Sequence, residues 1–405
     1  MSIFQKSSGV WSLVKTMRPK VSGVWQPPQE IRARISGSWI HVGHDPNYLF
    51  TWGRNDYYGQ LGDGTTTNRS SAVKIGSSTW NAIAAGRFFT MGILSNNRLY
   101  TWGKNNKGQI GDGTTTDRTT PTLIGSTTWR IVAGGYETAG AITQAYQLFT
   151  WGSNNCGTLG QGTTVAYNAT PARVGSSTWK AVSAWNHMLA IRSDNKLYGW
   201  GYDSTGAVSG VNGGTRNSPY AIGTCTWKFV SAGGNHSLGI RSDDKLFAWG
   251  GDEKGQCGQG STTSIRAMTQ VGTSTWKAIA AGGSFSLAIR SDNKCYAWGC
   301  NTTGQCGIGM VTDPLLTLTE ISDYYMDATD VPEKISASAG GSYSTRCHAA
   351  LLTTSGFLFT WGYDYYGQLG TGSSGTTLSR PVKTVRRYSF KDVSCGGEHT
   401  AVITR

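Results

Sequence analysis

A Trp-Gly pair returns seven times along this 405-residue chain, at an almost constant interval. The steps between successive pairs are 50, 49, 49, 49, 49 and 63 residues. The fuller unit reads L-[FY]-x-W-G-x-N-x-x-G-Q-[LIC]-G-x-G-T-T-T, and a second phrase, [ST]-T-W-[KRN]-x-[IV]-[AS]-A-G-G, follows a variable stretch. A period of this size indicates an array of supersecondary units that bury their apolar faces against one another.

Each unit contains short runs in which apolar residues alternate with other residues. In "SLGIRSDDKLFAWG" (237–250), Leu238 and Ile240 face one way, "SDDK" reverses the chain, and Phe247 and Trp249 alternate in the returning arm. Further strands are expected around 267–272 and 276–283. Four strands in each of seven units, with no helical periodicity, predict an all-β fold, a seven-bladed β-propeller.

The two ends of the chain complement each other. Residues 396–405 supply the first arm of a hairpin, and residues 48–53 supply a second arm with no partner before it. Pairing these segments completes one blade from both termini, closes the ring and removes two open sheet edges. We therefore expect the strand that follows Gly396 to pair with the strand at Tyr48.

The repeated tryptophans are expected to pack between blades, and two cysteines are expected to be buried. A fully buried Trp removes about 150–250 Å² from water, so seven equivalent indoles would form a core layer. Cys257 and Cys306 stand where other copies have Leu or Ile, and no C-x-x-C pair occurs among the eight cysteines. This pattern favours small buried hydrophobic residues over disulfides or zinc ligands.

The phrases "WGRNDYYGQLG", "WGKNNKGQIG" and "WGYDYYGQLG", with a downstream G-G-x-H-[ST], resemble the repeat of the regulator of chromosome condensation family. The resemblance covers residues 48–405 and implies a seven-bladed propeller whose loops bind protein. The founding member of the family is a nucleotide exchange factor for a small GTPase that also binds nucleosomes. Its exchange activity depends on features outside the repeat, so the resemblance does not carry that activity over.

No constellation of catalytic residues interrupts the repeat, and no enzyme activity, metal or cofactor is expected. His187, His236 and His399 occupy the G-G-x-H position, where other copies are aligned as Phe88, Glu137, Phe285 or Tyr343. Equivalent positions on different blades are spread around a ring, which favours hydrogen-bonded structural histidines over a metal site. The "GDGTTTD" loops lack EF-hand spacing and are interpreted as turns with side-chain to backbone hydrogen bonds.

Two groups of residues depart from the repeat and are candidate contact sites. Tyr57-Tyr58 and Tyr365-Tyr366 replace the usual Asn-Lys or Thr-Thr, on blades that become neighbours when the ring closes. A partner-facing patch is therefore predicted from the residues Arg54, Tyr57, Tyr58, Tyr363, Tyr365 and Tyr366, for protein or glycan contact. Loop packing between adjacent blades is the alternative.

The second group is the stretch 310–345, which makes one repeat 14 residues longer than the norm. Its loop residues Tyr324, Tyr325 and Met326 are a candidate partner-binding site. A neutral loop extension is the alternative.

Residues 1–47 have their own period and are predicted to form a separate module before the propeller (48–405). "SSGVWSLVK", "VSGVWQPPQ" and "ISGSWIHVG" place three tryptophans 14 residues apart, and each unit is expected to fold as strand, Ser-Gly turn and strand. The candidate docking residues are Trp11, Trp25, Trp39, Arg32 and Arg34. These units resemble small attachment segments of tailed-bacteriophage virion proteins. A plain extension and a cap on the propeller are the alternatives.

The net charge is +13, and each chain end carries an excess of four positive charges. No apolar run is long enough to span a membrane and no secretory signal is recognised, so synthesis in the host cytoplasm is expected. These features favour a non-catalytic structural or accessory protein of a phage virion, on the tail or capsid. Its partners would be other virion proteins bound through residues 1–47, a host surface protein or glycan, and further copies of the chain.

The alternative function is a regulatory or inhibitory protein that binds a soluble enzyme or a small GTPase. Binding to chromatin or DNA rests on the net charge alone, so a nucleic-acid partner is not expected.

Overall fold

The computed structural model describes residues 46–210, 214–322, 330–340, 345–384 and 388–405, together with the backbone of six short strands in the N-terminal segment. The chain divides into two compact units, Met1–His44 and Asp45–Arg405. Within the described ranges the only helical element is a single 3-10 turn, η1 (Asn155–Gly157), and no helix there could cross a membrane.

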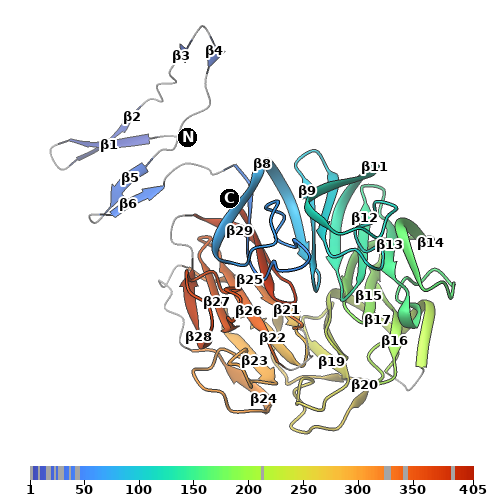
Figure 1. Ribbon diagram of the computed structural model, residues 1–405. Coiled ribbons are helices and arrows are strands. Elements are labelled where there is room, and N and C mark those ends of the chain that lie inside the picture. The colour runs from blue at the N-terminus through green and yellow to red at the C-terminus, as the bar shows by residue number, and fades with distance from the viewer. Residues whose placement is uncertain are drawn as a thin grey trace. The chain divides into compact units, whose positions relative to one another are not determined.

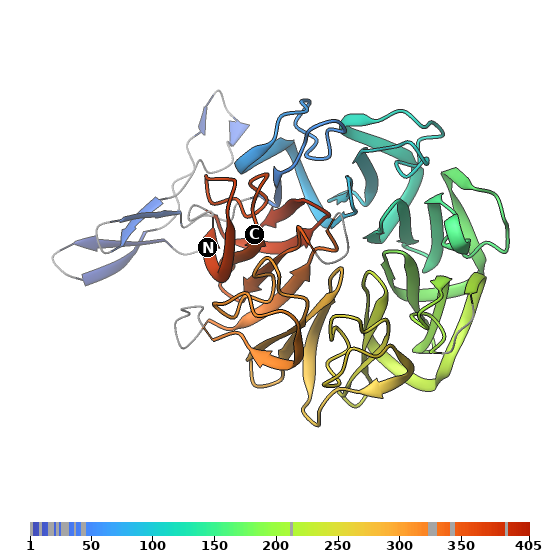
Figure 2. The ribbon, with the colours of Figure 1, turned by 60° about the horizontal axis from the view of Figure 1, so that its bottom comes forward.

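The larger unit is built from antiparallel strands that form seven four-stranded blades (Figures 1 and 2). The strands are β7 (Tyr48–Gly53), β8 (Arg69–Ala85), β9 (Phe89–Leu94), β10 (Arg98–Gly103), β11 (Arg118–Gly134), β12 (Thr138–Thr143), β13 (Gln147–Ser153), β14 (Tyr167–Ala184), β15 (His187–Arg192), β16 (Lys196–Asp203), β17 (Gly214–Ala232), β18 (His236–Arg241), β19 (Leu246–Gly250), β20 (Ile265–Gln270), β21 (Trp276–Ala281), β22 (Phe285–Arg290), β23 (Cys295–Gly299), β24 (Leu315–Glu320), β25 (Pro332–Ala337), β26 (His348–Thr353), β27 (Leu358–Tyr363), β28 (Thr377–Thr384), β29 (Phe390–Cys395) and β30 (His399–Thr404). The predicted seven-bladed propeller is confirmed.

The blades follow one another without separate connecting segments in the first half of the ring. Blade 1 is β29-β30-β7-β8, blade 2 is β8-β9-β10-β11, blade 3 is β11 to β14, blade 4 is β14 to β17, blade 5 is β17 to β20, blade 6 is β21 to β24 and blade 7 is β25 to β28. The long strands β8, β11, β14 and β17 therefore end one blade and begin the next. The first strands of successive blades contact one another around the centre of the ring.

The ring is closed by the two ends of the propeller unit. Strand β30 pairs antiparallel with β7, with His399 opposite Gly53 and Ile403 opposite Leu49. This is the pairing predicted from the two unpaired hairpin arms. It leaves neither terminal strand with an open sheet edge.

The Trp-Gly tryptophans pack between blades, as predicted, and all seven are fully buried. Six of them donate a hydrogen bond from Nε1 to a carbonyl in the loop of the preceding blade. In one example, Trp52 Nε1 lies 2.9 Å from the Gln368 oxygen. Gly370 has a φ of +69°, and a Cβ there would lie 2.7 Å from the Trp52 ring. The last glycine of G-Q-[LIC]-G thus lets one blade approach the indole of the next.

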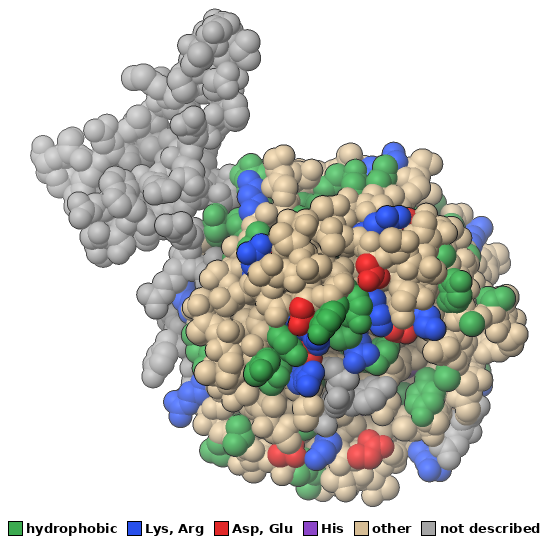
Figure 3. All heavy atoms as spheres, viewed as in Figure 1, with side chains coloured by type: hydrophobic (Ala, Val, Ile, Leu, Met, Phe, Trp, Pro, Cys, Tyr) green, Lys and Arg blue, Asp and Glu red, His purple; other side chains and the backbone are tan. Residues whose placement is uncertain are grey.

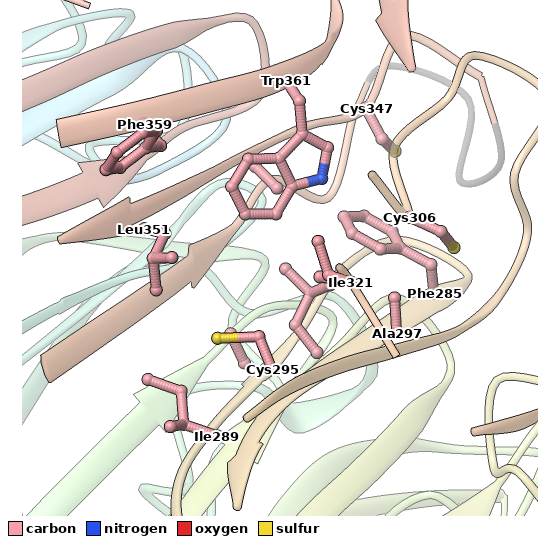
Figure 4. Packing of buried hydrophobic residues seen from close by; sticks show 13 residues of the cluster. Phe285, Ile289, Cys295, Ala297, Cys306, Ile321, Cys347, Leu351, Phe359 and Trp361 are labelled. Carbon is pink, nitrogen blue, oxygen red and sulfur yellow. The ribbon is translucent and has the colours of Figure 1, made fainter. Parts of the chain in front are cut away.

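The cysteine prediction is also confirmed at Cys257 and Cys306, which are free and fully buried. Figure 4 shows Cys306 in the core between blades 6 and 7, in the cluster that contains Phe285 and Trp361. Six of the eight cysteines are buried, whereas Cys225 is exposed.

The 14 extra residues of the longest repeat are not one insertion, as the sequence suggested. Strand pairing makes Pro332 equivalent to Trp276, so one half of the excess precedes β25. The other half lies between β25 and β26, because His348 follows Pro332 by 16 residues where His236 follows Trp227 by nine. The candidate residues Tyr324, Tyr325 and Met326 lie in the first insertion, outside the described residues.

The N-terminal unit contains three two-stranded antiparallel hairpins. The pairs are β1 (Ile3–Ser7) with β2 (Val10–Val14), β3 (Lys20–Val21) with β4 (Val24–Trp25), and β5 (Arg32–Ile35) with β6 (Ser38–His41). A Ser-Gly pair stands between the two strands of each hairpin, as the 14-residue period predicts. The side chains of Trp11, Trp25, Trp39, Arg32 and Arg34 lie outside the described part of the chain, so their docking role stays a prediction.

Candidate functional site

The predicted patch lies on the loop face, which we define as the side formed by the connections between the first and second strands, and between the third and fourth strands, of each blade. Tyr57 and Tyr58 follow β7, and Tyr365 and Tyr366 follow β27. The Tyr363 and Tyr365 rings stack with centroids 6.2 Å apart, and Tyr365 meets Tyr366 edge-on at 5.1 Å. The rings of Tyr57 and Tyr58 lie 6.1 Å apart.

Arg54 joins the two sets of tyrosines across the interface between blades 1 and 7. Its guanidinium carbon lies 4.6 Å from the Tyr366 ring centroid and 5.9 Å from that of Tyr57. The same guanidinium forms 2.5 Å ion pairs with Glu398 and with Asp56. The structure therefore brings together the residues of the predicted set, which we call the tyrosine–arginine patch (Arg54, Tyr57, Tyr58, Tyr363, Tyr365 and Tyr366).

Glu398 was not predicted, and it is the residue that fixes Arg54. Its side chain is fully buried and also pairs with Arg346 at 3.4 Å. Burial lowers the pKa of Arg54, but its hydrogen bonds and charge interactions with Glu398 and Asp56 outweigh burial and raise that pKa above its ordinary value. Arg54 is therefore a permanently charged side chain held in one orientation.

The exposed fractions differ within the patch. Tyr57 is 75% exposed and Tyr365 is 59% exposed, whereas Tyr58 and Tyr366 are half-buried. Tyr58 packs against Phe88 of blade 2, with ring centroids 5.5 Å apart. Loop packing thus accounts for the inner tyrosines, and two phenol rings face solvent.

The predicted alignment of the two Tyr-Tyr pairs was wrong by one position. The first repeat is 50 residues long because Tyr57 is an additional residue, so that Tyr58 is equivalent to Tyr366 and Asp56 to Tyr365. Tyr57 has a φ of +76°, in a region that a bulky residue occupies only at a cost of about 1–2 kcal/mol. The extra residue carries the most exposed ring of the patch.

The patch continues onto blades 2 and 3. Lys104 forms a 2.7 Å ion pair with Glu137, and its ammonium lies 5.4 Å from the Tyr58 ring centroid. Arg87 stacks on Tyr136 at 4.2 Å. Figure 3 shows hydrophobic side chains with basic and acidic ones between them near the middle of the propeller face in view.

The histidines form a ring of structural hydrogen bonds, as predicted, but their equivalents were misaligned in three repeats. Strand pairing places Phe89, Thr138 and His348 at this position instead of Phe88, Glu137 and Tyr343. The loop before His348 is longer than usual, whereas the loops before Phe89 and Thr138 have the usual length but an altered or shifted Gly-Gly pair. Each histidine Nε2 lies 2.7–2.9 Å from a hydroxyl on the next blade. The pairs are His187–Ser237, His236–Ser286, His348–Thr400 and His399–Thr90.

The tautomer of each histidine follows from the bonds of its partner. In every pair the hydroxyl donates to a loop carbonyl at 2.6–2.8 Å, so it must accept the proton on Nε2. Complete burial lowers the pKa of His187 to about 4 and the pKa of the other three to about 3. These imidazoles are neutral at physiological pH and are spread among the blades.

The Asp-Thr loops are turns, as predicted. Asp63 Oδ1 accepts bonds from the Thr65 amide and hydroxyl at 3.0 and 2.7 Å, and its carboxylate pairs with Arg69. Asp112 repeats this arrangement. Among the described residues there is no group of three or more His, Cys, Asp or Glu side chains placed to hold a metal ion.

Comparison with known proteins agrees with this architecture. A model of the RCC1-like domain matches residues 125–405, and models of the regulator of chromosome condensation (RCC1) repeat match residues 47–93, 80–109 and 96–142. The chain belongs to the RCC1-like domain family.

Solved structures show the same fold at low sequence identity. The RCC1-family chain is 18% identical to Prp20p from Saccharomyces cerevisiae, with a TM-score of 0.78, covering 89% of this chain and 92% of that one. It is 19% identical to human WBSCR16, also with a TM-score of 0.78, covering 89% and 100%. Prp20p is described with binding properties to Gsp1p and histones, and yeast RCC1 (Prp20) also in complex with Kap60.

Proposed function

We propose that this RCC1-family protein is a non-catalytic binding propeller that contacts a protein partner through the tyrosine–arginine patch. The observation that carries the proposal is the pair of exposed rings, Tyr57 and Tyr365, held beside an arginine that is anchored on the buried Glu398. Tyr and Arg are enriched among residues that dominate binding energy at protein interfaces.

The geometry favours binding because the Arg54 side chain loses little conformational freedom when a partner binds. Arg54 is fixed by two carboxylates and three aromatic rings before any partner arrives. Immobilising a flexible side chain at an interface costs about 0.5–1.5 kcal/mol, and a preorganised residue avoids most of that cost. Tyrosine adds a large contact area with only two side-chain torsions to order.

The partner class that we propose is a soluble enzyme or a small GTPase, which the chain would regulate or inhibit. The support is family membership and the fold shared with Prp20p, which is described as binding Gsp1p. Exchange activity is not part of the proposal.

The test is affinity capture from a lysate with wild type and the double variant Tyr57→Ser/Tyr365→Ser. One stoichiometric soluble partner should be captured by wild type, and its affinity should fall at least about tenfold in the double variant. The matched control is Tyr146→Ser, since Tyr146 is 41% exposed and stacked by Arg130 at 4.0 Å, but lies in a hairpin turn at the opposite end of the strands. Equal loss in both variants would refute the patch as the binding site.

A second candidate function is a structural or accessory component of a phage virion, made in the host cytoplasm, with the N-terminal hairpins as the attachment module. Its support is the triple hairpin with a 14-residue period, which forms a compact unit separate from the propeller. Removing residues 1–45 should leave a folded propeller that no longer joins the particle. Incorporation of the truncated protein into purified particles would contradict this function.

A further inference from the structure

A pocket of about 370 Å³ opens on the loop face at blades 3 to 5, next to the tyrosine–arginine patch but distinct from it. This volume lies at the lower end of the range of about 300–1,000 Å³ that is common for small-ligand sites. Its lining includes Tyr136, Asn155, Thr158, Trp185, Asn186 and Asn235.

The pocket exists where the repeat loses a glutamine. Five of the seven repeats have Gln in G-Q-[LIC]-G. In four of them the side-chain Oε1 accepts a hydrogen bond from a backbone amide of the same loop, as Gln109 Oε1 does from the Lys107 amide at 2.8 Å. The third repeat has Thr158 instead. The Thr158 hydroxyl turns back to the Ser153 carbonyl at 2.8 Å, and the volume of the longer side chain stays open.

Two aromatic residues stand where most other repeats have glycine. Trp185 stands in place of two glycines, equivalent to Gly233 and Gly234, in a loop that is one residue shorter than theirs. In the repeat before it, Tyr136 stands at the position of Gly234. The two rings meet edge to face with centroids 6.1 Å apart. The glutamine loss and both aromatic replacements therefore converge on one pocket, in an array that is otherwise close to uniform.

The polar groups of the pocket carry no net charge. Three side-chain amides, from Asn155, Asn186 and Asn235, line it, and the carboxylate of Glu137 is paired with Lys104. No lysine or arginine is among the lining residues, which disfavours an anion. A purely apolar ligand would make no bonds to these amides, whereas ligand hydroxyls can both donate to them and accept from them. Asn186 Nδ2 is already held in place by its bond to the Gly234 carbonyl at 3.1 Å.

We propose that this pocket binds a neutral sugar ring. Amide groups donate and accept at once, which matches the vicinal hydroxyls of a pyranose, and an aromatic face suits the apolar C–H face of the same ring. The proposal does not depend on the protein partner proposed above, since none of the six residues of the tyrosine–arginine patch lines the pocket.

The test is saturation-transfer NMR and titration calorimetry on the full chain with D-glucose, D-galactose, D-mannose and N-acetyl-D-glucosamine. At least one sugar should bind in wild type. Thr158→Gln restores the residue of the other repeats, fills the pocket, and should weaken binding about tenfold or more. Ala207→Gln is the matched control, because it restores the same glutamine one repeat later at a residue that does not line the pocket, and it should bind like wild type.

A second variant keeps the outcome clear if the first one rearranges the loop. Asn155→Ala removes one exposed amide of the pocket and leaves the aromatic walls, and it should weaken sugar binding while the melting temperature changes little. No saturation transfer to any of the four sugars, or equal binding by wild type and Thr158→Gln, would overturn the proposal.

Discussion

The pairing of His236 with Ser286 should be a measurable unit of coupling between blades. Wherever a blade carries histidine, the facing residue on the next blade is Ser or Thr. The two blades with phenylalanine, Phe89 and Phe285, face alanine in the same clusters. The same inter-blade contact is thus made either by a His–Ser or His–Thr pair or by a Phe–Ala pair. A double-mutant cycle of His236→Phe, Ser286→Ala and the double variant converts the first kind of pair into the second.

The magnitude follows from the contacts of the pair. Ser286→Ala leaves the proton on His236 Nε2 without an acceptor in a fully buried site, which costs about 1–3 kcal/mol. The Gln256 carbonyl loses the bond donated by the Ser286 hydroxyl but keeps the bond from Trp298 Nε1 at 2.7 Å, so this carbonyl adds little to the cost. His236→Phe places a ring carbon where Nε2 lies 2.8 Å from the hydroxyl, and the resulting overpacking costs about 1–3 kcal/mol.

The double variant removes both defects, since a Phe–Ala contact needs neither the hydroxyl nor its close approach. We expect it to be more stable than the sum of the single changes by about 1–2 kcal/mol. Urea unfolding followed by tryptophan fluorescence measures each free energy, with equal m-values as the condition for comparison. His236→Phe combined with Thr400→Ala, whose residues belong to different pairs, is the control and should be additive. Additivity of the His236 and Ser286 changes within about 0.5 kcal/mol would refute the coupling.

Two further predictions concern the same core. The four ring histidines have folded-state pKa values of about 3 to 4, below the ordinary 6.5, so the unfolded state binds more protons and stability falls as the pH drops from 6.5 toward 4. Asp252 and Asp364, whose pKa burial raises to about 6, oppose this loss, so we expect a net slope near two protons, or about 2.7 kcal/mol per pH unit around pH 5. Urea unfolding across this range measures the slope, and an increase of stability toward pH 4 would contradict it. Gly111 and Gly113 share a φ of +84°, but a Cβ would lie 2.6 Å from Trp151 Nε1 at the first and 3.8 Å from its nearest neighbour at the second. Gly111→Ala should therefore destabilise by about 1–3 kcal/mol more than Gly113→Ala in the same assay, and equal effects would disprove the packing role.

The repeat made the propeller and its closure predictable, because those depend on patterns that every copy shares. Period-2 alternation places the strands, and the unmatched arms at residues 48–53 and 396–405 determine the last pairing. The neighbouring positions of the tyrosines followed from closure alone. Glu398 was missed because its role depends on burial, although its place directly before His399 and in the blade of Arg54 was a usable signal.

Details failed where a copy departs from the phrase that was used to align it. One additional residue displaced the Tyr57 alignment, and seven additional residues before β26 displaced His348. Phe89 and Thr138 were misplaced by one position because the Gly-Gly pair before them is altered or shifted, although their loops have the usual length. The pocket could not be predicted for a different reason. It arises because the side chain of Thr158 is shorter than the glutamine of the other repeats. A gap of this kind becomes visible only when the neighbouring walls are in place.

The departures from the repeat fall into two kinds, and the difference separates structure from function. Changes that serve packing are compensated across the blade interface, as His with Ser and Phe with Ala show. The changes at Tyr57 and Thr158 have no such complement: the first leaves an exposed ring on the loop face, and the second lines an open pocket there. A scaffold under selection for stability alone would remove an exposed aromatic ring in a strained conformation. We therefore expect binding energy to be concentrated at these uncompensated positions and stability at the compensated ones.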